Sequence, residues 1–177
     1  FFFHLIDHTK VAVSSQLDIS PAMASLTTST PTITLSAAQL ILASALHAAN
    51  LQSTEMNVSI VDPSCNEVLF ARMNSAKITS IDVARSKAFT SAGHKAPTRK
   101  FSSYAGVTGP AFGLHVSNNC RFSIIPGGYP ITDKNGVLYG AIGVSGGTPD
   151  QDEEVAKAGV EAFRLALEKG GGNKSKL

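Results

Sequence analysis

The chain has 177 residues, of which 43% are hydrophobic and only 16% are charged, and its formal net charge is +2. This length suits one domain with a substantial core, and the lack of a basic stripe with interleaved aromatic residues argues against nucleic acid as a partner. No apolar stretch approaches the roughly 20 residues of a transmembrane helix, so we expect no membrane partner. The two cysteines, Cys65 and Cys120, are too far apart for a zinc motif or a disulfide framework, and we expect reduced thiols in a cytoplasmic protein.

The N-terminal region shows no helical or strand periodicity. It begins with an apolar run that is too short for a signal peptide and lacks a basic flank. Because Met23 opens a Met-Ala-Ser sequence typical of a natural start, residues 1–22 are interpreted as upstream or added sequence. Alternatively, their phenylalanines form an arm that docks on a neighbour, since apolar rings are costly to leave in water. We expect an N-terminal extension at 1–32, a domain at 33–169 and a flexible tail at 170–177.

A helix and a strand pair open the expected domain. Ser36 and Gln39 have the spacing of a capping box, and the apolar residues that follow at helical spacing predict a helix to about Asn50. Short apolar runs predict strands at 58–61 and 68–72, because an Asp-Pro-Ser-Cys-Asn turn joins them.

The middle of the chain predicts a second helix and a third strand. The helix runs over 80–92, with a narrow face of small residues and a stop at Gly93. A short helical piece is expected at 99–105 and a loop at 106–114. Apolar residues at 122–125 predict the third strand.

A glycine-rich hairpin and a helix complete the domain. Asn135-Gly136 lies between two apolar runs, which predicts a tight turn between the fourth and fifth strands. Thr148 and Gln151 then cap a last helix that has Pro149 at its first position. The order α-β-β-α-β-β-β-α predicts an α+β fold, an antiparallel sheet of about five strands with helices packed on it.

Four glycines in this hairpin suggest a small-molecule site: Gly127, Gly128, Gly146 and Gly147. Glycine lets the backbone approach a ligand closely, and the start of the last helix offers unpaired N–H groups to an anion. Alternatively, these glycines serve only their tight turns.

Several of these segments together resemble the GlcG/HbpS-like family, often called the haem-degrading domain family. The segments are 58–62 with 69–73, 82–88, 126–131, and 140–148 followed by 151–154. The resemblance covers about Ile33 to Glu168 and implies a profilin-like domain that assembles into dimers or larger oligomers. It also implies haem or corrinoid-related partners for some members. The Glu-x-x-Glu iron site of one member type has no counterpart in this sequence, so we expect no metal site.

Cations gather between positions 85 and 100, with no acid after Asp82. Within this group, Arg85, Lys87 and Arg99 are candidates to hold carboxylates or haem propionates, because guanidinium groups make bidentate contacts with them. Alternatively, the cations complement the dipole at the end of a helix in water.

His94 is the candidate general base or axial iron ligand, and His115 is the second candidate, because imidazole titrates near neutral pH and ligates iron. Tyr104 is a candidate catalytic hydroxyl, and Tyr129 is a candidate contact for a ligand oxygen or ring. Alternatively, both tyrosines pack in the core or an interface. We expect the pocket between the helix near Arg85, the segment from His94 to Arg99 and the four glycines.

Three function classes follow from these residues and the resemblance. The first is a binding protein of the haem-binding or haem-degrading type, which takes a small anionic molecule and has haem as its candidate cofactor. The second is a cofactor-independent isomerase or lyase that acts on a small carboxylated or carbonyl metabolite. The third is a non-catalytic accessory or sensor domain. Alanine-rich helix faces and many aromatic residues also predict a homo-oligomer.

Overall fold

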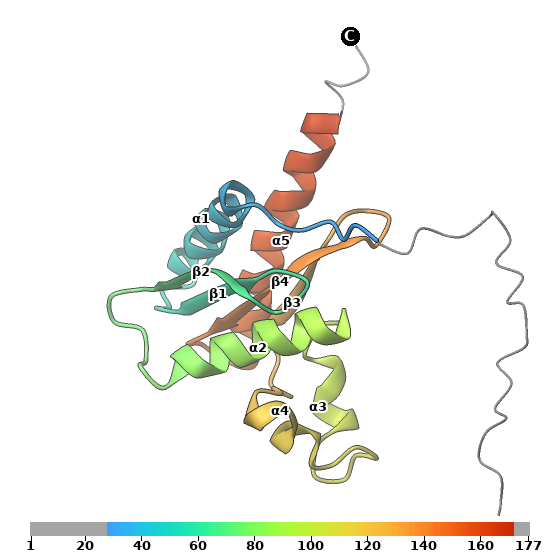
Figure 1. Ribbon diagram of the computed structural model, residues 1–177. Helices are drawn as coiled ribbons and strands as arrows, with labels where there is room; N and C mark the ends of the chain where they lie inside the picture. The colour runs from blue at the N-terminus through green and yellow to red at the C-terminus, as the bar shows by residue number, and fades with distance from the viewer. Residues whose placement is uncertain (1–27, 172–177) are drawn as a thin grey trace, which may run out of the picture.

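The computed structural model describes residues 28–171, and an antiparallel sheet of four strands lies at its centre (Figure 1). The strand order is β2-β1-β4-β3. The strands are β1 at Asn57–Val61, β2 at Glu67–Arg72, β3 at Gly128–Thr132 and β4 at Leu138–Ser145. The expectations for residues 1–22 and for most of the C-terminal tail lie outside the described residues.

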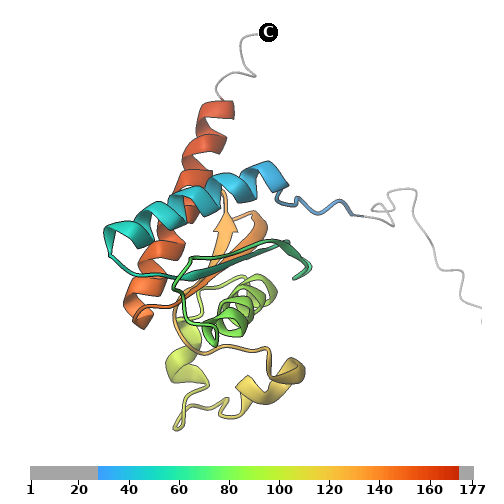
Figure 2. The same cartoon turned by 90° about the vertical axis from the view of Figure 1, so that its left-hand side faces the viewer.

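Helices cover both faces of the sheet, which confirms the predicted α+β architecture. Helices α1 (Leu35–Leu51) and α5 (Pro149–Gly171) lie together on one face, and α2 (Ser80–His94) lies on the other (Figures 1 and 2). A small lobe lies on the side of α2 that is turned away from the sheet (Figure 2). It contains α3 (Lys100–Tyr104), the 3-10 helix η1 (Leu114–Val116) and α4 (Ser117–Cys120).

The alternation of β1 separates the core from the α2 side. Val58 and Ile60 are fully buried in the main core against α1 and α5, whereas Ser59 and Val61 face α2. Large apolar side chains fill the main core, among them Ile41, Met56, Ile131, Ile142, Val155, Val160 and Phe163.

The predicted small-residue face of α2 meets the sheet directly. Ala84, Ala88 and Ala92 are buried there. At Gly143 in β4 an added Cβ would lie 2.1 Å from the carbonyl oxygen of Ala84, so the helix backbone lies against the strand. Small residues on both elements therefore allow α2 to approach the sheet closely.

The predicted strand at 122–125 is wrong. The backbone groups of this apolar run bond to side chains instead of a neighbouring strand. The Ser123 amide donates to the Thr90 hydroxyl at 2.8 Å, and the Ile124 carbonyl accepts from the Ser102 hydroxyl at 2.8 Å. The run is a linker that is buried at Phe122 and Ser123 and exposed at Ile125, and the sheet has four strands rather than five.

Two helix ends also differ from their predicted positions. The first helix is capped by Thr34, whose hydroxyl accepts from the Ala37 amide at 3.2 Å, and Ser36 is an exposed residue within the helix. The second helix continues through Gly93 and ends at His94, and the capping residue Lys95 takes a left-handed conformation with φ 53°.

The turn and cap at the end of the chain are as predicted. Gly136 has φ 80° in the hairpin turn, and Asp133 accepts from the Val137 amide at 2.9 Å. Thr148 and Gln151 exchange the two side-chain hydrogen bonds of a capping box, at 3.3 and 2.9 Å.

A buried ion pair joins α2 to the start of α5. The Lys87 ammonium lies 2.7 Å from the Asp152 carboxylate, and the two side chains are only 1% and 4% exposed. Lys87 also donates to the Val144 carbonyl at 2.8 Å, and Asp152 accepts from the Gly147 amide at 2.9 Å. Desolvation lowers the pKa of Lys87, and the charge and hydrogen bond of Asp152 oppose that shift.

Replacing Lys87 with Met should lower the free energy of unfolding by about 3–5 kcal/mol, because Asp152 is then a buried carboxylate without its partner. The matched control is Lys77→Met, which changes an exposed lysine. The double variant Lys87→Met/Asp152→Leu should recover part of the loss. Urea unfolding measures all three, and a single variant as stable as the parent would contradict the assigned role of the pair.

Candidate functional site

The four glycines of the predicted pocket face protein atoms. An added Cβ at Gly127 would lie 2.8 Å from the Lys87 ammonium, and one at Gly128 would lie 2.4 Å from the Lys87 carbonyl. At Gly146 the nearest atom is a backbone carbonyl at 2.5 Å, and at Gly147 it is the Gln151 side-chain oxygen at 2.9 Å. The structure therefore gives these glycines a role in close packing of the backbone.

The structure does not bring the predicted cations together. Lys87 is buried in its ion pair with Asp152. Arg99 pairs with Asp150 and Glu153 at the start of α5. Arg85 alone among the three candidate cations lines the cavity described below.

The predicted histidine and tyrosines occupy separate places. The exposed His94 packs edge-on against Phe101 and Phe122, with ring centroids 5.0 and 4.9 Å apart. Tyr104 on α3 is 51% exposed. Tyr129 on β3 lines a different cavity of about 370 Å³ on α5.

The ion pairs of Arg99 with Asp150 and Glu153, here called the Arg99 clamp, affect the stability of the fold in acid. Burial raises the pKa of Glu153, but hydrogen bonds from Lys157 and Arg99 outweigh it and hold that pKa below 4.5. A carboxyl group with a lowered pKa in the folded state stabilises the fold above its unfolded pKa. That stabilisation is lost as pH falls through the folded pKa.

Glu153→Gln should therefore cost about 1–2 kcal/mol of stability at pH 7, and it should reduce the loss of stability below pH 4.5. Thermal unfolding between pH 3 and 7 measures both effects. Glu168→Gln, at an exposed position of the same helix, is the control. Parallel acid profiles for the parent and Glu153→Gln would exclude the clamp as a source of acid sensitivity.

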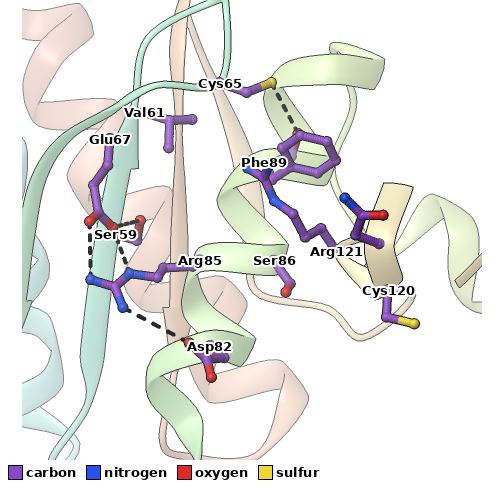
Figure 3. Close-up of a pocket in the computed structure, with 11 residues that line it drawn as sticks. Ser59, Val61, Cys65, Glu67, Asp82, Arg85, Ser86, Phe89, Cys120 and Arg121 are labelled. Atoms are coloured by element: carbon purple, nitrogen blue, oxygen red, sulfur yellow. Dashed lines mark hydrogen bonds and ion pairs between the residues drawn. The ribbon is translucent and has the colours of Figure 1, made fainter. Parts of the chain in front are cut away.

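A cavity of about 610 Å³ lies between the β1–β2 hairpin, α2 and the end of α4 (Figure 3). None of the four glycines of the predicted pocket lines this cavity. Its lining residues are Ser59, Val61, Cys65, Glu67, Asp82, Arg85, Ser86, Phe89, Asn119, Cys120 and Arg121.

A hydrogen-bonded network forms the sheet side of this cavity. Arg85 donates to both oxygens of Glu67, at 3.0 and 3.1 Å, and the buried Ser59 hydroxyl donates to the same carboxylate at 3.0 Å. The Arg85 guanidinium also lies 4.6 Å from the ring centroid of Phe70. Its hydrogen bond with Glu67 raises the pKa of Arg85, so the group stays charged and paired.

Arg121 forms the opposite side of the cavity. Its guanidinium carbon lies 4.0 Å from the ring centroid of Phe89 on α2. Within residues 28–171, no carboxylate forms an ion pair with Arg121. Sequence reasoning missed this residue because it lies outside the cationic group at positions 85 to 100.

A second cavity of about 420 Å³ adjoins the first and shares Asp82, Ser86 and Cys120 with it. Its other lining residues are mainly apolar: Val83, His115, Phe122, Ser123, Ile124 and Ile125. The Nδ1 atom of His115 is buried and has no hydrogen-bond partner among the described residues. We call the two cavities together the α2 groove.

Both cysteines line the α2 groove and have left-handed backbone conformations, with φ 66° at Cys65 and 60° at Cys120. Burial raises the pKa of the Cys65 thiol, and the positive charge of Arg121 opposes that shift. Cys120 follows Asn118 and Asn119, which are also left-handed at 54° and 57°. Asn tolerates this conformation, whereas at Cys the Cβ makes it costly.

Cys120→Gly should raise the free energy of unfolding by about 1 kcal/mol, because glycine adopts the left-handed conformation without strain. Cys120→Ser keeps the Cβ and should leave stability unchanged. Thermal unfolding compares the two variants. Equal midpoints for both would show that the backbone at this position stores no strain.

Two further searches concern metals and membranes. In the part of the chain that the structure describes, no group of three or more His, Cys, Asp or Glu side chains is arranged to hold a metal ion. Among the same residues, no helix combines the length and the apolar character needed to cross a membrane.

Sequence comparisons identify relatives of the chain. A family model described as "Haem degrading protein HbpS-like" matches residues 33–161. The chain is 37% identical over 136 residues to an uncharacterized 15.0 kDa protein in the dhaT-dhaS intergenic region of Citrobacter freundii, which covers 75% of this chain and 92% of that protein. It is 29% identical over 127 residues to the corrinoid adenosyltransferase PduO of the same species, but this match covers 72% of the chain and only 37% of that enzyme.

Solved structures with the same fold include three proteins of similar size. Protein ORFY of Klebsiella pneumoniae has a TM-score of 0.77 at 32% identity, covering 80% of this chain and 97% of that one. The complex of PduOC with haem has a TM-score of 0.70 at 27% identity, covering 74% and 94%. A double mutant of HbpS from Streptomyces reticuli has a TM-score of 0.68 at 29% identity, covering 80% and 94%.

Proposed function

The chain belongs to the HbpS-like haem-degrading family, and from this premise we propose that it binds haem in the α2 groove. One solved structure with this fold is a haem complex, which supports haem as the class of ligand. The proposal moves the site away from the predicted glycine turns, because those turns are packed against protein atoms.

The buried, unpartnered Nδ1 atom of His115 is the observation that carries the proposal. A buried polar atom without a hydrogen bond costs free energy, and a ligand that bonds to it removes that cost. Haem iron is bound by histidine in many proteins. His115 is one of the residues that line the apolar cavity of the groove.

The rest of the groove also fits haem. Its apolar cavity offers Val83, Phe122 and Ile124 to a flat hydrophobic ring, and its polar cavity offers arginine to propionates. Bound haem would supply a redox-active iron. The residues of this chain would hold the ring, ligate the iron and bind the acidic groups.

A small carboxylated metabolite is the second candidate ligand, for an isomerase or lyase. The polar lining of the larger cavity favours it, since Ser86 and Arg121 offer donors to a carboxylate. His94, the predicted proton carrier, does not line this cavity. Such an enzyme would therefore need another acid or base from the groove.

Titration with hemin tests the proposal through the Soret band. The parent protein should saturate at one hemin per chain. His115→Ala should shift the band and weaken binding by at least about tenfold, which corresponds to about 1.4 kcal/mol. His47→Ala on α1, across the sheet from the groove, is the matched control and should bind like the parent.

His94→Ala tests the ligand that the sequence favoured. If this variant shifts the Soret band and His115→Ala does not, iron is held by His94. If the parent shows no saturable Soret change, the chain is not a haem-binding protein, and binding of small carboxylates becomes the leading candidate.

A further inference from the structure

The two arginines of the α2 groove differ in what they contact. Arg85 gives two hydrogen bonds to Glu67 and lies 3.9 Å from Asp82, so two carboxylates already surround its charge. Arg121 contacts the face of Phe89 and pairs with no carboxylate of the described residues. Figure 3 shows the two side chains pointing in different directions, Arg85 to the strand and Arg121 to Phe89.

The larger cavity is lined by two arginines and two acids, and both acids, Glu67 and Asp82, lie on the Arg85 side. The Arg121 guanidinium makes a cation–π contact with the Phe89 ring, and its N–H groups form no ion pair with a carboxylate of the described residues. A ligand carboxylate is therefore attracted to Arg121 and repelled by the acids around Arg85.

The backbone before Arg121 also supports a ligand-binding position. Asn118, Asn119 and Cys120 take left-handed conformations in succession, and Arg121 follows them. Strained backbone of this kind occurs where the surrounding structure fixes an unusual conformation, often at ligand sites. Two residues later, the Ser123 amide bonds to Thr90 on α2 at 2.8 Å, which holds the segment close to the groove.

We propose that Arg121 binds a carboxylate group of the ligand, and that Glu67 keeps Arg85 from making a second such contact. For haem, this group is a propionate, and in that respect the inference rests on the proposed function. The groove then selects a ligand with a carboxylate at its polar end over the same ligand with that group esterified.

Hemin and hemin dimethyl ester are the matched ligands that test this selection. The parent should bind hemin about 10- to 100-fold more tightly than the ester, as expected for a charged hydrogen bond. Arg121→Gln should bind both with similar affinity, and Arg121→Lys should retain part of the preference. Arg72→Gln at the end of β2 is the control and should behave like the parent. A preference for hemin that survives in Arg121→Gln would overturn the assignment.

Glu67→Gln tests the second half of the proposal. Neutralising this carboxylate frees Arg85 for a ligand, so hemin should bind several-fold more tightly while the ester gains less. An unchanged or weaker preference for hemin would show that Glu67 does not withhold Arg85.

A small probe separates this inference from the proposed function. Benzoate is titrated into the parent while the Arg121 Nε–H signal is followed by NMR, with benzamide as the uncharged control. If hemin fails to bind but benzoate shifts the Arg121 signal, haem binding is wrong and the carboxylate site stands. If hemin binds through His115 and neither Arg121→Gln nor benzoate has an effect, haem binding stands and the carboxylate site is overturned.

Discussion

The ion pair between Lys87 and Asp152 is the interaction on which the arrangement depends. Its atoms connect α2, the end of β4 and the first turn of α5, because Lys87 also bonds to Val144 and Asp152 to Gly147. A buried charge pair has few alternative partners, so it fixes α2 on the sheet in one position. Because α2 is held in this position, Ser86 and Phe89 on its side away from the sheet form one side of the groove.

Local signals predicted most of the fold. The cap at Thr148, the turn at Gly136 and the small face of α2 each depend on neighbouring residues, and the structure contains all three. The strand expected at 122–125 is absent, and the pattern of apolar residues could not predict this. Its apolar pattern is real, but side chains from α2 and α3 take its backbone hydrogen bonds.

The candidate site was harder to predict, because its residues depend on distant contacts. Lys87 lies among other cations in the sequence, and its buried partner follows 65 positions later. Arg85 was one of three candidate cations, and its pairing with Glu67 depends on the register of the hairpin. Arg121 lies outside the cationic group at positions 85 to 100 in the sequence. Its side chain reaches the cavity only because the lobe folds against Phe89. The assignment of a ligand to these residues stays a proposal.

The two sides of the groove differ in the number of interactions that hold them in place. One side is α2 and the sheet, with many backbone hydrogen bonds and a buried ion pair. The other is the lobe, whose return to α2 includes single bonds such as that between Ser123 and Thr90. Local opening of the lobe is therefore easier than global unfolding, and a molecule that bridges both sides opposes it. Under the proposed function, occupancy would then appear as slower amide exchange and slower proteolysis of the lobe.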